Sequence, residues 1–403
     1  MPDAVGSVAL PTKPNVDLAE LAAQRLARLR DALTDGPFDA VVLTSPESIA
    51  YATGYRSVGG GIFRGHSMAA VVTADDSWLA APAADSAAAA DSGIPAERIV
   101  PFGRFYFESA NGSTIAHAAD RNADLTEALR WVLKQIDGIG LAIGVERPDD
   151  QLVRAALEQE KLGEVDATAW IASVRGPKLP AEVALLRYAA RLAETGIEAA
   201  LLDAGPGITE AELARSIATT MVAGGADPRF IVATVGDRTA LADAYPTDRE
   251  WRAGELARFD VGCVYAGYWS DMARSAVLGT PTDLQARRYA ALLAGEEQQL
   301  TIARPGIKAF ELFDAAVQVV ERGGVTPYRR HHCGHGIGLS VYETPIVSPG
   351  VQTKLRPGMT FCFETPYYEI GWGGMMVEDT LVVTEDGVDL LTESDRNLRV
   401  VTT

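Results

Sequence analysis

Acidic residues interrupt three apolar, strand-like segments in the second half of this chain, at Asp260, Glu364 and Glu378. Unpaired carboxylates are rare in such segments, because removing a charge from water costs free energy. With Asp271 and His335 they form a set of four carboxylates and one imidazole, whose roughly four negative charges two divalent cations would balance. One such acid alone is more often a solvated surface charge, but the five residues together are expected to hold two metal ions.

The segment 258–275 is expected to form two strands around a turn at residues 266–267. The turn centre fixes the register, so Asp260 and Asp271 are expected either directly opposite each other or one diagonal step apart. Both registers place the two carboxylates on the same face of the sheet.

A second pair of extended segments, 359–365 and 375–383, flanks a glycine-rich bend. This pair could bring Glu364 to Glu378 in the same way. His335 lies in Cys333-Gly-His-Gly-Ile-Gly338, where the glycines allow the backbone to approach closely.

The chain resembles the creatinase, prolidase and aminopeptidase P family of metallohydrolases. The motifs that carry this resemblance are Ser45-Pro-Glu-Ser-Ile-Ala-Tyr-Ala-Thr-Gly54, Pro246-Thr-Asp-Arg249, Gly334-His-Gly-Ile-Gly338 and Val377-Glu-Asp-Thr380. The resemblance implies an α+β fold. Its carboxy-terminal "pita-bread" catalytic domain, a curved antiparallel sheet with outer helices, would follow a creatinase-like α/β amino-terminal domain.

The resemblance also implies the cofactor and the roles of the five residues. They would bind two divalent ions, with Mn expected first and Co, Fe or Zn as alternatives. Glu364 would also act as the proton shuttle. Two cations that share one water lower its pKa towards neutrality and polarise a carbonyl, so the implied reaction is the attack of hydroxide on an amide-type carbon.

Three positions depart from the pattern of the family's peptidases. Tyr342 stands seven residues after His335, where a second histidine is usual, and Asp243 replaces another histidine. Met376 stands where an arginine commonly precedes the last metal ligand. A phenol with a pKa near ~10 can donate to an oxyanion but is a poor acid or base at neutral pH. The lost cation and the added carboxylate predict a pocket that favours an amine or guanidinium over a free carboxylate.

Other candidates for substrate contact lie nearby or in the first domain. His331 and His332 adjoin the metal-binding loop, although histidines beside a loop are as often simply solvated. In creatinase-like relatives the amino-terminal domain of one subunit closes the active site of its partner. The resemblance therefore implies a homodimer in which Arg64 could supply the cation lost at Met376.

Composition limits the partners and the compartment. A net charge of −18 argues against nucleic acid or an anionic membrane as partner. No apolar run approaches the length of a membrane span, and the first residues lack a signal-peptide pattern. Three cysteines cannot all pair, which suits a reducing compartment. A cytoplasmic protein is expected.

Helical and strand-like patterns alternate in the first half, which predicts a parallel or mixed sheet with helices packed on it. A stretch with Pro and Gly at residues 173–180 precedes a long helical segment, 181–203. The expected domains are therefore 1–172 and 173–403. Thr209-Glu-Ala-Glu212 fits a capping box that opens a further helix.

The favoured function is hydrolysis of an amide or peptide C–N bond in a small molecule or short peptide, with a substrate altered from Xaa-Pro. Three alternatives stay open. The chain could be a genuine Xaa-Pro aminopeptidase or dipeptidase, or a metal-dependent lyase in which a tyrosine acts as the base. A non-enzymatic binding scaffold is the least favoured, because all five metal-binding residues are retained.

Overall fold

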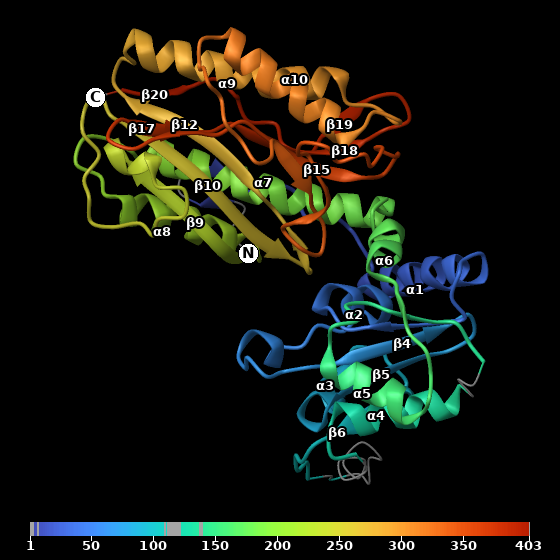
Figure 1. The fold of residues 1–403 in the computed structure, drawn as a ribbon. Coiled ribbons are helices and arrows are strands. Elements are labelled where there is room, and N and C mark those ends of the chain that lie inside the picture. Colours follow the sequence, from blue (N-terminus) through green and yellow to red (C-terminus); the bar gives the residue numbers. More distant parts are fainter. Residues whose placement is uncertain (1–3, 6–7, 109, 111–121, 137–139, 403) are drawn as a thin grey trace. The chain divides into compact units, whose positions relative to one another are not determined.

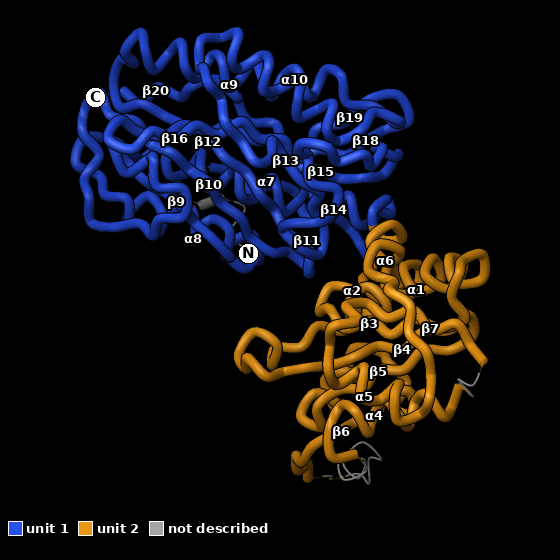
Figure 2. Tube along the Cα trace, viewed as in Figure 1, with its two compact units in different colours: residues 1–16, 176–403 blue, residues 17–175 orange. Residues whose placement is uncertain are grey.

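The computed structural model describes residues 4–5, 8–108, 110, 122–136 and 140–402 (Figure 1). It divides into two compact units, residues 17–175 and residues 1–16 with 176–403 (Figure 2). This division differs from the expected one at residues 1–16 and 173–175. Leu10 packs against the core of the second unit, and a helix continues to Arg175, which moves the change of unit to Gly176.

The unit formed by residues 17–175 contains a six-stranded mixed sheet in the order β6-β5-β4-β3-β7-β8. The strands are β3 (Ala40–Leu43), β4 (Ala69–Thr73), β5 (Ser77–Pro82), β6 (Ile99–Phe102), β7 (Ile143–Val145) and β8 (Val165–Asp166). The helices are α1 (Leu18–Thr34), α2 (Pro46–Thr53), α3 (Ser86–Asp91), α4 (Leu125–Gln135), α5 (Gln151–Gln159) and α6 (Thr168–Arg175). The mixed sheet with helices on it confirms the prediction for this half of the chain.

Local chemistry explains where the helices of this unit begin and end. The Asp17 side chain accepts hydrogen bonds from two amides of the first turn of α1. Ser45 caps α2 and is followed by Pro46, and Gly54 ends that helix with φ of 76°. Only glycine adopts such a left-handed conformation without strain, so the helix stops there.

The larger unit is built on a ten-stranded sheet with the central order β11-β10-β12-β18-β15-β13-β14, to which β9, β19 and β20 add at β10, β18 and β12. The strands of this sheet are β9 (Asp227–Val235), β10 (Leu256–Tyr265), β11 (Tyr268–Trp269), β12 (Met272–Leu278), β13 (Gly334–Gly336), β14 (Glu343–Ile346), β15 (Thr360–Glu364), β18 (Glu378–Val383), β19 (Val388–Leu390) and β20 (Arg399–Val401). Short pairs are formed by β1 (Ala4–Val5) with β2 (Val8–Ala9), and by β16 (Tyr367–Glu369) with β17 (Gly373–Met375).

Four helices pack on this sheet: α7 (Pro180–Leu202), α8 (Glu210–Ala223), α9 (Asp283–Ile302) and α10 (Ala309–Arg322). The predicted capping box is present at the start of α8, where Thr209 and Glu212 bond reciprocally to each other's backbone amides. The long α9 and α10 lie side by side along the sheet (Figure 1).

Alternation along the strands separates an apolar face of the sheet from a polar one. Phe259 and Val261 on β10 belong to the core that α7 and α8 cover, and Phe361 and Phe363 on β15 belong to the core that α9 and α10 cover. Because successive side chains of a strand point to opposite faces, Asp260 points to the face opposite Phe259 and Val261.

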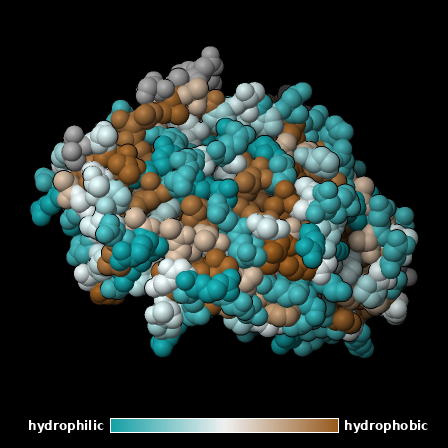
Figure 3. Space-filling model, turned by 90° about the horizontal axis from the view of Figure 1, so that it is seen from above, coloured by the Kyte–Doolittle hydropathy of each residue, from teal (hydrophilic) through white to brown (hydrophobic). Residues whose placement is uncertain are grey.

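Exposed apolar residues do not gather into a belt on the face shown in Figure 3, where brown and teal residues are interspersed. Within the parts of the chain that the structure describes, no helix is long and apolar enough to cross a membrane.

Candidate metal centre

Three carboxylates lie in one row across the sheet. Asp260 on β10 pairs with Ala273 on β12, Ala273 pairs with Glu378 on β18, and Glu378 pairs with Glu364 on β15. Directly paired residues of antiparallel strands point to the same face, so the three carboxylates share it. The direct pairing of Glu364 with Glu378 is the arrangement expected from the sequence.

Asp271 and His335 lie one step from this row. The β10–β12 register places Asp260 opposite Ala273, so Asp271 is one diagonal step away, which is the second of the two registers expected. The turn between the strands lies at the expected residues, where Ala266 and Gly267 have φ of 49° and 94°. Two positive φ angles are typical of the tight turn that matches the twist of a hairpin. His335 on β13 pairs with Cys362, two residues before Glu364 on β15.

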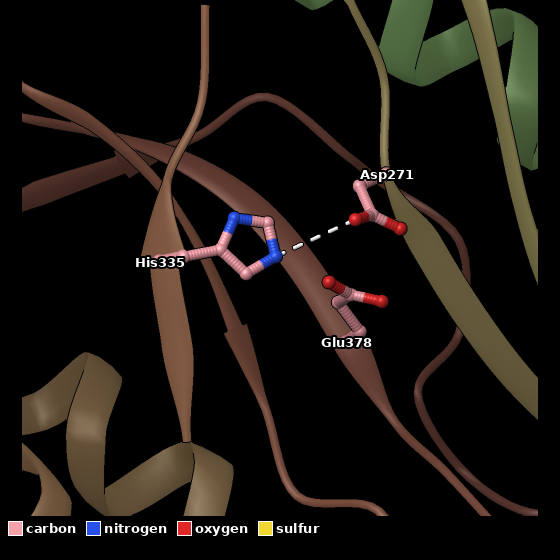
Figure 4. A group of neighbouring side chains, drawn as sticks. All are labelled: Asp271, His335 and Glu378. Atoms are coloured by element: carbon pink, nitrogen blue, oxygen red, sulfur yellow. Dashed lines mark ion pairs between the residues drawn. The ribbon is translucent and has the colours of Figure 1, made fainter. Parts of the chain in front are cut away.

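Asp271, His335 and Glu378 converge most closely. Each offers one ligand atom, and these atoms all lie within 4.8 Å of one another. Figure 4 shows the imidazole and the two carboxylates pointing toward one another from different segments of the sheet. His335 Nε2 lies 3.4 Å from Asp271 Oδ2, and His335 Nδ1 lies 3.0 Å from the Gly336 carbonyl oxygen. If Nδ1 donates to that carbonyl, Nε2 is free to bind a cation, which is the usual arrangement of a metal-binding histidine.

The donor set fits a hard or borderline divalent cation. Carboxylate oxygens and an imidazole nitrogen suit Mn, Fe, Co and Zn. Within the described part of the chain, Glu378 Oε2 is buried and has no hydrogen-bond partner. A buried carboxylate oxygen without a donor is costly, and a cation would supply the missing interaction.

The other two carboxylates contact arginine and histidine side chains. Asp260 Oδ2 lies 3.1 Å from Nη1 of Arg258. Glu364 Oε1 lies 2.7 Å from Nδ1 of His332, and its Oε2 lies 3.9 Å from Nη2 of Arg330. His332 therefore contacts one of the proposed metal-binding residues, Glu364.

The electrostatics reflect this crowding of buried acids. Burial and Asp271 raise the pKa of Asp260 to about 7. Burial and the neighbouring carboxylates raise the pKa of Glu378 well above its ordinary value. Burial would also raise the pKa of Glu364, but His332, His335 and Arg330 together more than offset it, so the pKa of Glu364 is lowered. Bringing these acids together costs free energy, which cations would offset.

A groove of about 740 Å³ opens beside the centre. Asp260, Asp271, Asp243 and Tyr342 line it. The groove is also lined by α8, where Ala211, Ala214, Arg215 and Ala218 follow helical spacing, and by residues 228–232 of β9, which include Arg229. The groove therefore offers carboxylates at the centre and two arginines on its other walls.

The remaining predicted residues differ in their surroundings. Tyr342 is half exposed, and its ring stacks on His335 with the centroids 3.8 Å apart. His331 is exposed and meets His332 edge to face. Met376 is buried, and its sulfur accepts a hydrogen bond from the Tyr368 hydroxyl at 3.8 Å. Arg64 is exposed in the other unit.

Sequence reasoning missed Arg258, Arg330, Tyr368 and the two groove arginines. Arg258 gives the clearest signal that could have been used, because it precedes Asp260 by two residues on a predicted strand and so shares its face. Arg258 also lies in one row across the sheet with Met376. Arg258 pairs with Ser275 on β12, and the Ser275 hydroxyl bonds to the backbone amide and carbonyl of Met376. A fixed cation therefore stands two strands from the position where the family's arginine is absent.

Comparison with known proteins identifies the class. Residues 184–385 match the model of metallopeptidase family M24, and residues 25–175 match that of the creatinase/prolidase N-terminal domain. The fold is thus that of a metallopeptidase with a pita-bread catalytic domain and a creatinase-like amino-terminal domain, as predicted. The chain belongs to the M24 family, and it is a metal-dependent peptidase of that type.

Individual relatives agree with this assignment. The chain is 27% identical to the Xaa-Pro dipeptidase of Pyrococcus furiosus over 379 residues, which cover 93% of this chain and 99% of the relative. It is 36% identical to the probable dipeptidase PepE of Mycobacterium tuberculosis over 198 residues, or 49% of this chain and 53% of the relative. The crystal structure of dipeptidase PepE from Mycobacterium ulcerans superposes with a TM-score of 0.80 at 26% identity, covering 97% of this chain and 100% of that one.

Proposed function

We propose that the chain hydrolyses a peptide or amide C–N bond in a short peptide or small molecule, using two divalent ions bound by Asp260, Asp271, His335, Glu364 and Glu378. The observation that carries this proposal is the gathering of the four carboxylates and the imidazole on one face of the sheet, beside an open groove. Mn is the ion we expect first, with Co, Fe or Zn as alternatives.

The bound ions would activate a water molecule and polarise the substrate carbonyl. Glu364 is the residue proposed to carry the proton from the attacking water to the departing nitrogen. Its contact with His332 at 2.7 Å fixes its orientation, because the imidazole is itself buried. His332 is thereby a positioning residue in this proposal.

Tyr342 is proposed to donate a hydrogen bond to the carbonyl oxygen of the substrate, which becomes negative as the water oxygen attacks the carbon. Partial burial and the carboxylates of the centre raise the pKa of Tyr342. The phenol therefore keeps its proton at neutral pH and can act as a donor only. This role makes a base function for Tyr342, and with it the lyase reaction, less favourable.

For the substrate, we propose a group with a free amine or guanidinium that lies near Asp243, because Met376 itself supplies no positive charge to bind a carboxylate. A second candidate is a genuine Xaa-Pro dipeptidase. Two observations favour it: the relative from Pyrococcus furiosus carries that name, and Arg215 and Arg229 could receive a carboxylate in the same groove.

Assays of the metal-stripped protein, reloaded separately with Mn, Co, Fe or Zn, would test the proposal. The panel would contain Xaa-Pro dipeptides, other dipeptides, and amides that carry an amine or guanidinium, with products identified by mass. We expect hydrolysis with water added, and a fall in kcat of about 10²-fold or more in Glu364→Gln. Glu385→Gln, an exposed acid outside the site, is the matched control and should keep full activity.

Several outcomes would contradict the proposal. An unsaturated product without added water would indicate a lyase. Absence of turnover with all four ions would contradict the proposed hydrolysis. Preference for Xaa-Pro dipeptides over the cationic amides would favour the second candidate. By resemblance we also propose a cytoplasmic homodimer, with which the three free, buried cysteines are compatible.

A further inference from the structure

Arg258 is a buried cation that the proposed reaction does not use. Its side chain is completely buried on β10. Nη1 donates to Asp260 Oδ2 at 3.1 Å, and Nε donates to the Thr239 carbonyl at 3.0 Å. Nη2 donates to the carbonyls of Leu241 and Ala242 at 2.8 and 2.7 Å. The guanidinium thus joins one carboxylate of the centre to the segment 239–242.

This contact changes the charge balance of the centre. Four carboxylates alone would need about four positive charges. Arg258 lies 3.1 Å from Asp260, and Arg330 lies 3.9 Å from Glu364. With these two guanidiniums the centre keeps roughly two negative charges, which one divalent ion balances. A second ion must therefore bind where less negative charge remains.

The positions of the proposed ligand atoms also favour one ion position over the other. Asp271, His335 and Glu378 converge within 4.8 Å, whereas Asp260 stands outside this group and its Oδ2 already accepts from Arg258. An ion that takes both oxygens of Asp260 must displace Nη1 and lie near a fixed positive charge. Breaking a buried ion pair by removing its partner costs free energy, so the second ion binds against that cost.

We propose that Arg258 is a positioning residue that pairs with Asp260 and makes the ion position at Asp260 weaker than the one formed by Asp271, His335 and Glu378. This inference rests on the proposed function, since it needs the centre to bind metal.

Arg258 also connects the second ion position to the substrate groove. The segment 239–242 that it holds leads directly to Asp243, which lines the groove. The segment is tied down at its other end as well, because the Thr239 hydroxyl accepts from the Gly374 amide at 2.7 Å. Arg258 therefore contacts both the Asp260 position and the residues that lead to Asp243.

Titration of the metal-stripped protein with Mn²⁺ and with Co²⁺, followed by calorimetry and by the visible absorption of Co²⁺, would test the inference. In the wild-type protein we expect one tight ion and a second whose Kd is at least about tenfold higher. Arg258→Met removes the charge and should strengthen the second ion by about tenfold or more, while the first changes little. Arg258→Lys keeps the charge and should keep the unequal pattern.

A gain of affinity separates the inference from a purely structural role, because a destabilised site would bind metal more weakly. Arg258→Gln is the second neutral variant, since its amide can still donate to the 239–242 carbonyls if Arg258→Met fails to fold. Two equally tight ions in the wild-type protein, or an unchanged second Kd in both neutral variants, would overturn the inference and leave the proposed function intact. Absence of any bound ion would instead contradict the proposed function.

Discussion

At the scale of single residues, Glu296 and Asp379 form a pair of buried carboxyl groups on the sheet face opposite the metal row. Asp379 pairs with Phe363 across the strands and accepts from Arg274 Nη2 at 2.6 Å. Burial and Asp379 raise the pKa of Glu296 well above its ordinary value, while burial opposed by Arg274 leaves the pKa of Asp379 lowered. The raised pKa favours the protonated form of Glu296 in the folded state, beside the ionised form of Asp379.

Glu296→Gln should remove a pH dependence of stability. Above its unfolded pKa near ~4.3 the unfolded chain loses the Glu296 proton and the folded chain keeps it, so folding stability from this group falls as pH rises. The variant cannot titrate, and its amide can still donate to Asp379. We expect its free energy of unfolding, relative to wild type, to rise by up to about 1.4 kcal/mol per pH unit above roughly pH 5.

Urea unfolding at pH 5, 6, 7 and 8, with metal chelated throughout, would measure this difference. The exposed neighbour Glu297 supplies the control, because Glu297→Gln removes an acid from the same helix without touching Asp379. A difference between Glu296→Gln and wild type that stays constant with pH would contradict the assignment of a protonated Glu296.

At the scale of elements, the close approach of β13 to β15 fixes the place of His335. Gly334 has φ of 132°, and a Cβ atom there would lie 2.4 Å from the Cys362 carbonyl oxygen. A backbone atom cannot move aside as the end of a flexible side chain can. The added methyl group of Gly334→Ala should therefore push β13 away from β15 and displace the His335 imidazole. We expect a loss of about 1–3 kcal/mol of stability and at least about tenfold weaker binding of the first metal ion.

Urea unfolding and Mn²⁺ titration would check this expectation. Gly205→Ala is a suitable control, because Gly205 lies between α7 and α8 with open space around its Cβ position. Wild-type metal affinity in Gly334→Ala would show that the spacing of β13 and β15 does not set the position of His335.

At the scale of the whole molecule, the two units have separate cores, and all five proposed metal-binding residues belong to one of them. An ion that binds the folded state stabilises it by about 2.7 kcal/mol at a free concentration of 100 Kd. Hydrogen exchange followed by mass spectrometry should therefore show Mn²⁺ raising protection in β10, β12, β13, β15 and β18. Residues 17–175 should exchange at the same rate with and without Mn²⁺. Equal protection of both units, or of neither, would contradict this expectation.

The sequence by itself determined the features that depend on neighbours in the chain. Helix caps such as Ser45 with Pro46, and Thr209 with Glu212, act within a few residues, so the starts of α2 and α8 were predictable. The turn at Ala266 and Gly267 is equally local. The character of the centre was also open to prediction, because several carboxylates in apolar segments have few stable solutions other than binding cations.

Only the tertiary structure decided which strands meet and in which register. The hairpin pattern allowed two registers, and the pairing of Asp260 with Ala273 distinguishes them. The pairing of β9 with β10 and the wall that α8 contributes to the groove join segments that no local pattern connects. Besides Asp260, the partners of Arg258 are the backbone carbonyls of Thr239, Leu241 and Ala242, and every residue type offers such a carbonyl. The residue types could therefore predict a metal centre. The charge around that centre depends on contacts between distant segments, and these contacts form only when the chain folds.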